Sequence, residues 1–303
     1  MLITSNQLKG FGIRATDGEL GIVDQLYFDD ETWAIRYLTV ETGGWLGGRP
    51  VLISPVSVIF ADADARCLNV ALTKKQVAES PDVDTQKPVS RQHEADYLQY
   101  YGYPFYWEGP YLWGPAAYPM GSLQLSDTAA DALKDRAREE SLDSHLRSTQ
   151  EVSGYHLETI DGEIGHVDGF VIDIEAWAIR YVEVATRNWW PGKKVLFSPG
   201  WVERVSWLDS RVHVHLTREA IENAPGYDES KTITREYEAR LFFHYGQAPY
   251  WLMARHPIGC LRNDSAAALL GSANRPPIVA RQPCWWCRLS VHASAAVRNE
   301  PSS

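Results

Sequence analysis

The chain has 303 residues, 45% of them hydrophobic and 22% charged, with a formal net charge of −10. This length allows two domains that each bury a core. The acidic balance argues against nucleic-acid binding, which needs Lys and Arg to neutralise phosphates. No apolar run of about 18 residues occurs, so we expect no transmembrane segment. Only four cysteines are present, which predicts no disulfide framework and favours a cytoplasmic location.

The first hundred residues read as short strands separated by turns. Asp17-Gly18 is a dipeptide typical of tight hairpins, and the stretch that follows, 20–28, is rich in strand-forming residues. In 33–38, alternation predicts Trp33, Ile35 and Tyr37 on one face and Arg36 on the other. Further strands are predicted at the ranges 51–53, 56–60 and 68–72. Five or six short strands at this spacing indicate a small antiparallel barrel, closed or nearly so.

Two short helices follow the strands. Thr73 and Gln76 have the spacing of a capping box, which predicts a helix that ends near Pro81. A second helix is predicted to begin at Ser90 and to end at Gly102, because glycine is favoured just after a helix.

The whole pattern then recurs 144 positions later. Asp17-Gly18-Glu19-Leu20-Gly21 returns as Asp161-Gly162-Glu163-Ile164-Gly165, and Trp33-Ala34-Ile35-Arg36-Tyr37 returns as Trp177-Ala178-Ile179-Arg180-Tyr181. No gap is needed between Gly10 and Trp107, which excludes coincidence and indicates a duplicated unit. We therefore predict a mainly β protein with short helices, built from two small antiparallel β-barrels that are each followed by one or two short helices. The predicted boundaries are 1–107 for the first repeat, 108–149 for an aromatic, Pro-rich and then charged linker, 150–251 for the second repeat and 252–303 for a disordered tail.

These motifs resemble the PRC-barrel family. The resemblance rests on the Asp-Gly-Glu-x-Gly turn, the Trp-Ala-Ile-Arg-Tyr strand and the Val-Leu-x-Ser-Pro strand end, and the 186–194 loop is similar to that of tandem PRC-barrel proteins. It implies a strongly bent small barrel, similar to those of the cytoplasmic domain of the photosynthetic reaction-centre H subunit and the C-terminal domain of the ribosome maturation factor. In those settings the barrel docks onto partners without covalent chemistry, so the resemblance implies the fold and not the partner.

The loops 44–49 and 189–194, each in a turn between two predicted strands, are the leading candidate interface. Adjacent Trp residues in a turn cannot both face one core, so at least one is expected to be exposed as an anchor. The alternative is that Trp45 and Trp189 cap their barrels. The candidate protein-binding residues are Trp45, Arg49, Trp189, Trp190, Lys193 and Lys194.

Other polar groups have structural explanations beside functional ones. Arg36 and Arg180 either pair with a carboxylate such as Asp24 or Asp168, or form an anion or ligand site. The carboxylates Asp17, Glu19 and Asp24, with Asp161, Glu163 and Asp168, serve turn geometry, bind a cation or perform acid–base chemistry. His213 and His215 have metal-ligand spacing but no evident third ligand, and Cys284 and Cys287 have redox spacing in an unpatterned tail.

No catalytic motif is recognisable, so we predict a non-enzymatic protein without metal or cofactor. The leading hypothesis is a cytoplasmic interaction or scaffolding module whose partner is a protein, with a membrane-associated complex and a homodimer both left open. The first alternative is a small-ligand or anion sensor that uses the cleft between the barrels. The second is a role like that of the reaction-centre H subunit in photosynthetic electron transfer, which rests on the resemblance alone.

Overall fold

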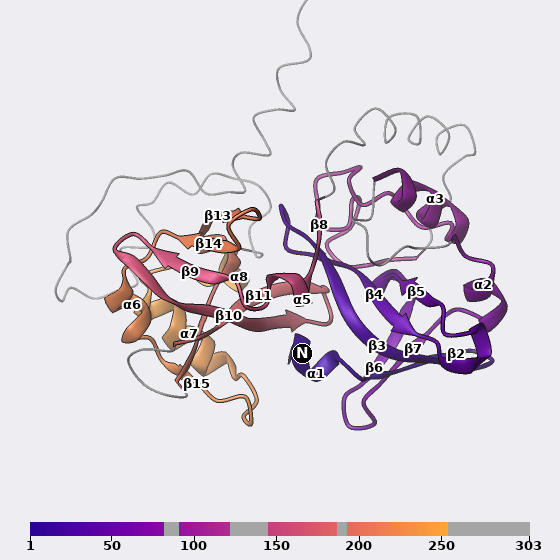
Figure 1. Ribbon diagram of the computed structural model, residues 1–303, viewed down its shortest axis with the longest axis horizontal. Helices are drawn as coiled ribbons and strands as arrows, with labels where there is room; N and C mark the ends of the chain where they lie inside the picture. The colour runs from indigo at the N-terminus through magenta and orange to yellow at the C-terminus, as the bar shows by residue number, and fades with distance from the viewer. Residues whose placement is uncertain (82–90, 122–144, 187–192, 254–303) are drawn as a thin grey trace, which may run out of the picture. The chain divides into compact units, whose positions relative to one another are not determined.

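The computed structural model describes residues 1–81, 91–121, 145–186 and 193–253 (Figure 1). Both sheets of the protein lie in one compact unit, Met1–Gln247. The unit that follows begins at Ala248, and its described part forms one short helix, α8 (Tyr250–Met253). The predicted disordered tail begins at Leu252, but Leu252 and Met253 belong to α8; the rest of the tail and most of the predicted linker fall outside the described residues.

The first sheet has the order β5-β4-β3-β2-β7-β6, and β8 pairs with β3 outside this path (Figure 1). All its neighbours are antiparallel except β2 and β7, a parallel pair that the sequence analysis did not predict. Its strands are β2 (Gly12–Ala15), β3 (Gly18–Asp29), β4 (Ile35–Glu41), β5 (Pro50–Ile53), β6 (Val58–Asp62), β7 (Cys67–Val70) and β8 (Leu146–Ser148). Its helices are α1 (Ser5–Leu8), η1 (Gly43–Leu46), η2 (Pro55–Ser57), α2 (Lys74–Ala78) and α3 (Arg91–Tyr101).

The second sheet repeats this order as β13-β14-β9-β10-β11-β12, with β15 added beside β12 and with β1 paired to β10. Its strands are β1 (Leu2–Thr4), β9 (His156–Thr159), β10 (Gly162–Asp173), β11 (Ala178–Ala185), β12 (Lys194–Phe197), β13 (Val202–Ser206), β14 (Arg211–Val214) and β15 (Gly226–Tyr227). Its helices are α5 (Thr149–Val152), η3 (Pro199–Trp201), α6 (Arg218–Glu222) and α7 (Arg235–His244). The predicted fold class, mainly β with two sheets and short helices, is confirmed.

The predicted helix signals form real caps. The Thr73 side chain accepts a hydrogen bond from the backbone amide of Gln76. The Gln76 side chain accepts one from the backbone amide of Thr73, which completes the capping box of α2. The Thr234 side chain caps α7 by accepting a hydrogen bond from the backbone amide of Tyr237. Gly102 and Gly246 follow α3 and α7 with φ of +68° and +64°, a conformation that glycine adopts without steric cost.

The predicted alternation along β4 is wrong at one position. A register shift between β3 and β4 makes Arg36 a bulge, because Tyr27 faces Tyr37 while Phe28 faces Ile35. Ile35 therefore packs into the main core, whereas Tyr37 packs into a second cluster beneath α3. Arg180 is the bulged residue at the equivalent place in the second sheet.

The two sheets exchange their first strands. β1 precedes the first sheet in sequence but pairs with β10, with Ile3 opposite Ile172. Reciprocally, β8 pairs with β3, with Arg147 opposite Phe28. Two hydroxyl groups stabilise the exchanged strands. Ser5 Oγ accepts a hydrogen bond from Phe170 N at 3.2 Å, and Thr149 Oγ1 accepts one from Leu26 N at 3.4 Å.

An antiparallel bridge between Ala34 and Ala178 relates the halves by an approximate two-fold axis. Ile35 N donates to Trp177 O and Ile179 N donates to Trp33 O, both at 2.8 Å. Trp33 and Trp177 are buried and take φ of +59° and +50°, which is uncommon for a bulky residue. The reciprocal hydrogen bonds engage the carbonyl groups of both tryptophans, and the Trp33 amide donates to Asp29 O within its own hairpin at 2.7 Å.

We expect Ile3→Ala to loosen the second sheet although the substitution lies at the start of the first repeat. Loss of this buried side chain should lower the free energy of unfolding by about 2–5 kcal/mol. Hydrogen–deuterium exchange should then be faster at β10 around Val171. Leu146→Ala, the matched control, should instead speed exchange in β3. Faster exchange confined to the first sheet in Ile3→Ala would contradict the strand exchange.

Candidate functional site

Trp45 is partly buried against the barrel. Its ring is partly buried against the core, its Nε1 donates to Leu20 O at 2.6 Å, and the ammonium of Lys74 lies 5.3 Å from the ring centroid. This arrangement corresponds to the barrel-capping alternative for Trp45. Trp189 and Trp190 fall outside the described residues, so their binding role stays a prediction.

The basic residues of the same loops have local partners. Arg49 Nη2 donates to the last carbonyl groups of α2, at 3.4 Å from Val77 O and 3.2 Å from Ala78 O. Lys193, its equivalent in the second half, donates to Glu222 O at the end of α6. Both cations therefore cap helix C-termini, where positive charge is favourable.

Arg36 is one of the most buried charged residues, with 2% of its surface exposed. Its guanidinium binds Asp29 Oδ2 at 3.2 Å and Leu112 O at 2.7 Å, and it lies 3.7 Å from the centroid of the Tyr106 ring. Burial would raise the pKa of Asp29, but the charge of Arg36 and hydrogen bonds from Thr32 hold it below its usual range. Arg36 thus fastens the aromatic segment 105–113 to the sheet.

Arg180 makes the equivalent pair with Asp173 Oδ2 at 2.8 Å and is one-quarter exposed. The carboxylate partners are therefore Asp29 and Asp173, and the expectation of Asp24 or Asp168 is wrong. The reason is the bulge, which turns each arginine toward the end of its own hairpin.

The turn carboxylates also have structural partners. Asp17 Oδ1 accepts from Lys74 N at 2.9 Å, and Asp161 Oδ1 accepts from Arg218 N at 2.8 Å, so each aspartate satisfies an amide in the first turn of a short helix. His213 is partly buried on β14, and His215 is exposed just after the end of this strand. Cys284 and Cys287 lie outside the described residues.

A buried polar network that the sequence analysis missed holds α3 on the first sheet. Glu94 is 2% exposed and accepts hydrogen bonds from Tyr37 and Tyr106, while Arg91 Nη1 lies 3.4 Å from its other oxygen. Burial raises the pKa of Glu94 to about 7, although the charge of Arg91 and the hydrogen bond from Tyr106 act in the opposite direction. In the second half, Glu238 binds Tyr181 and Arg235 in the same way.

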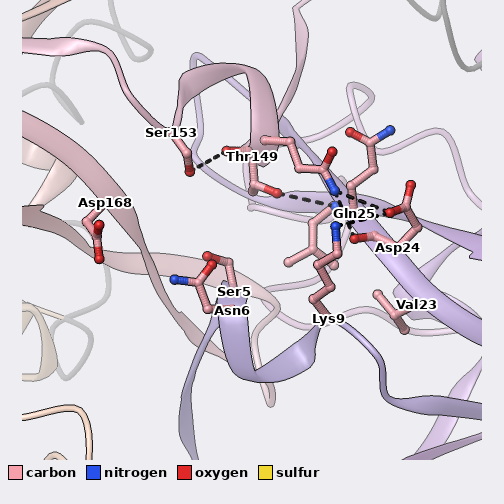
Figure 2. Close-up of a pocket in the computed structure, with 11 residues that line it drawn as sticks. Ser5, Asn6, Lys9, Val23, Asp24, Gln25, Thr149, Ser153 and Asp168 are labelled. Atoms are coloured by element: carbon pink, nitrogen blue, oxygen red, sulfur yellow. Dashed lines mark hydrogen bonds and ion pairs between the residues drawn. The ribbon is translucent and has the colours of Figure 1, made fainter.

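A polar cleft of about 210 Å³ lies where the exchanged segments meet (Figure 2). Gln150 Nε2 donates to Asp24 Oδ1 at 3.3 Å, and Lys9 Nζ lies 3.3 Å from the same oxygen. Neither Arg36 nor Arg180 lines it, and its carboxylates oppose the binding of an anion. The lining residues are Ser5, Asn6, Lys9, Val23, Asp24, Gln25, Leu26, Thr149, Gln150, Ser153 and Asp168.

The outermost strand of the first sheet, β6, carries exposed apolar side chains. Ile59 is 67% exposed and Phe60 is 58% exposed. Within the described ranges β6 pairs with β7 alone, and Ile59 is its bulged residue, because Val58 faces Val70 while Phe60 faces Asn69. The equivalent residues of β13 are Glu203 and Arg204, a difference that alignment of the two repeats would have shown. An apolar open edge is a template for pairing with another chain, whereas charges discourage such pairing.

Comparison with known families supports the fold. Residues 2–76 match the PRC-barrel domain, so the chain contains one such domain from β1 into α2. No curated protein matches the chain. Within the described ranges, no helix is long and apolar enough to cross a membrane.

We expect Glu94→Gln to flatten the pH dependence of stability. Because the folded-state pKa is about 7 and the unfolded value is near 4.5, the native protein binds this proton more tightly. The free energy of unfolding of the wild-type protein should therefore fall as pH rises between these values. The amide keeps an acceptor for Tyr106 and stays neutral.

The gain of Glu94→Gln over wild type should therefore grow from pH 4.5 to pH 8, by an amount on the order of 3 kcal/mol. Urea unfolding followed by tryptophan fluorescence at several pH values measures this. Glu79→Gln, at an exposed position just after α2, is the control. Its difference in free energy of unfolding from wild type should not grow in this way with pH. Parallel pH curves for Glu94→Gln and wild type would contradict the assignment.

Proposed function

We propose that this chain is a non-enzymatic protein-interaction module of two PRC-type barrels that acts in the cytoplasm. The PRC-barrel match at residues 2–76 suggests such a module. The repeated strand order and the 144-residue sequence repeat support a second barrel of the same type. The few cysteines favour a reducing compartment.

The observation that carries the proposal is the open edge of β6. Ile59 and Phe60 project from the last strand of the sheet, where they are the most exposed apolar residues of the first sheet's strands. The partner that fits this edge is an extended apolar segment of another protein. Such a segment would add a strand through main-chain hydrogen bonds and place alternate side chains against Ile59 and Phe60.

The second half supports the same interpretation by contrast. Its β13 has the same place in the sheet and the same exposure pattern, but Glu203 and Arg204 stand where β6 has Ile59 and Phe60. The barrel fold itself therefore does not require apolar residues here. Exposed apolar residues that the fold does not need are characteristic of interaction sites.

The small-ligand alternative has the cleft as its support, but the volume of about 210 Å³ is below that of drug-sized ligand pockets. The reaction-centre-H-like role and a membrane-associated partner remain predictions from resemblance.

We expect the double variant Ile59→Glu, Phe60→Arg to lose the partner and keep its fold. It transfers the residue pair that β13 already carries, so circular dichroism and thermal unfolding should change little. Affinity capture from native extract, compared quantitatively with wild type, should show a protein that is retained by wild type and lost by the variant.

Glu203→Ser, Arg204→Ser is the matched control on β13 and should retain the partner. Sedimentation of the purified protein shows whether the partner is a second copy of this chain. Identical captured proteins for wild type and the β6 variant would contradict the proposal.

A further inference from the structure

Three carboxylates surround one ammonium group in the second sheet. Lys194 Nζ lies 2.6 Å from Asp168 Oδ2 and 2.7 Å from Glu183 Oε1, and it also contacts Glu229. Oxygens of the three acids lie within 4.8 Å of one another. One positive charge therefore faces three carboxylate groups.

Strand pairing brings these groups together. Asp168 is the bulged residue of β10, next to the pair formed by Gly169 and Glu183. Lys194 begins β12 and faces Tyr227 of β15, and this short strand places Glu229 beside it. In the first sheet, Thr39 and Pro50 stand at the positions of Glu183 and Lys194, so the cluster belongs to the second half alone.

Glu183 is the residue that points to a ligand. Its side chain is fully buried. The Lys194 ammonium lies 2.7 Å from Oε1, whereas Oε2 has no hydrogen-bond partner in the described part of the chain. Lys194 directs its hydrogen bond to Asp168 Oδ2 and approaches only Oε1 of Glu183 as an ion pair. The second oxygen, Oε2, is left without a donor, which is costly for a buried carboxylate.

We propose that Asp168, Glu183 and Glu229 form a binding site for a hard divalent cation, with Ca²⁺ the best fit, and that Lys194 occupies the cation position in the free protein. Carboxylate oxygens are the ligands such ions prefer. One oxygen from each of the three acids lies within 4.8 Å of the others, so a single ion can reach all three at the Ca²⁺–oxygen distance of roughly 2.4 Å. Asp168 also lines the polar cleft (Figure 2), and Glu229 is exposed, so the cluster is open to solvent on two sides.

This arrangement makes Lys194 a built-in competitor of the ion. Binding requires the ammonium to move away, and its long flexible stem and partial exposure allow that movement. Removal of the lysine charge should therefore tighten Ca²⁺ binding, whereas removal of the buried carboxylate should abolish it. These opposite effects distinguish a cation site from a purely structural ion-pair network.

The test is isothermal titration of the full chain with CaCl₂ and with MgCl₂, together with thermal unfolding at each ion concentration. We expect millimolar or tighter Ca²⁺ binding by wild type, at least tenfold tighter binding by Lys194→Met, and none by Lys194→Met combined with Glu183→Gln. Circular dichroism confirms that each variant is folded, and Asp24→Asn serves as a cleft control that should bind as wild type does. Failure of folded Lys194→Met to bind Ca²⁺ at 10 mM, or equal binding after Glu183→Gln, would overturn the proposal. Should Lys194→Met not fold, Lys194→Gln provides the same comparison.

Discussion

The hydrogen bonds that Ile35 and Ile179 make across the two-fold axis are the constraint on which the rest of the structure depends. They join the ends of two hairpins at Trp33 and Trp177, each of which has a left-handed backbone conformation. With the hairpin ends fixed in this way, β1 reaches β10 and β8 reaches β3, so each sheet is completed by a strand from the other repeat. Neither half has all of its strand partners within its own sequence.

The shared frame leaves other positions open to divergence. Residues that make the exchange, such as Ser5 and Thr149, keep the same hydrogen-bonding role in both halves. The proposed binding features instead lie where the repeats differ: apolar residues on the β6 edge of one, and Glu183 with Lys194 in the other. This division is physically reasonable, because a surface can change without loss of the pairing that holds the halves together. The two halves therefore share one strand order but carry unlike residues at these positions.

Several residues that look like an interface in the sequence have structural partners. Trp45 donates its ring nitrogen to a barrel carbonyl, and Arg49 satisfies carbonyl groups at the end of α2. Sequence alone could not assign these partners, because the loop, the barrel mouth and the helix end are distant along the chain. Glu94 was missed for the same reason. Its helix has a polar sequence, and the residue becomes buried only when the segment that carries Tyr106 folds over it.

The sequence by itself determined the local features: the hairpin turns, the capped helices, the repeat and the mainly β fold class. Each follows from residues close together in the chain, such as Thr73 with Gln76, or from direct comparison of the two copies. The tertiary structure alone decided the strand exchange, the bulges at Arg36 and Arg180, and the gathering of Asp168, Glu183 and Lys194. Those features depend on register between strands, and a shift of one residue moves a side chain to the opposite face without changing the local pattern.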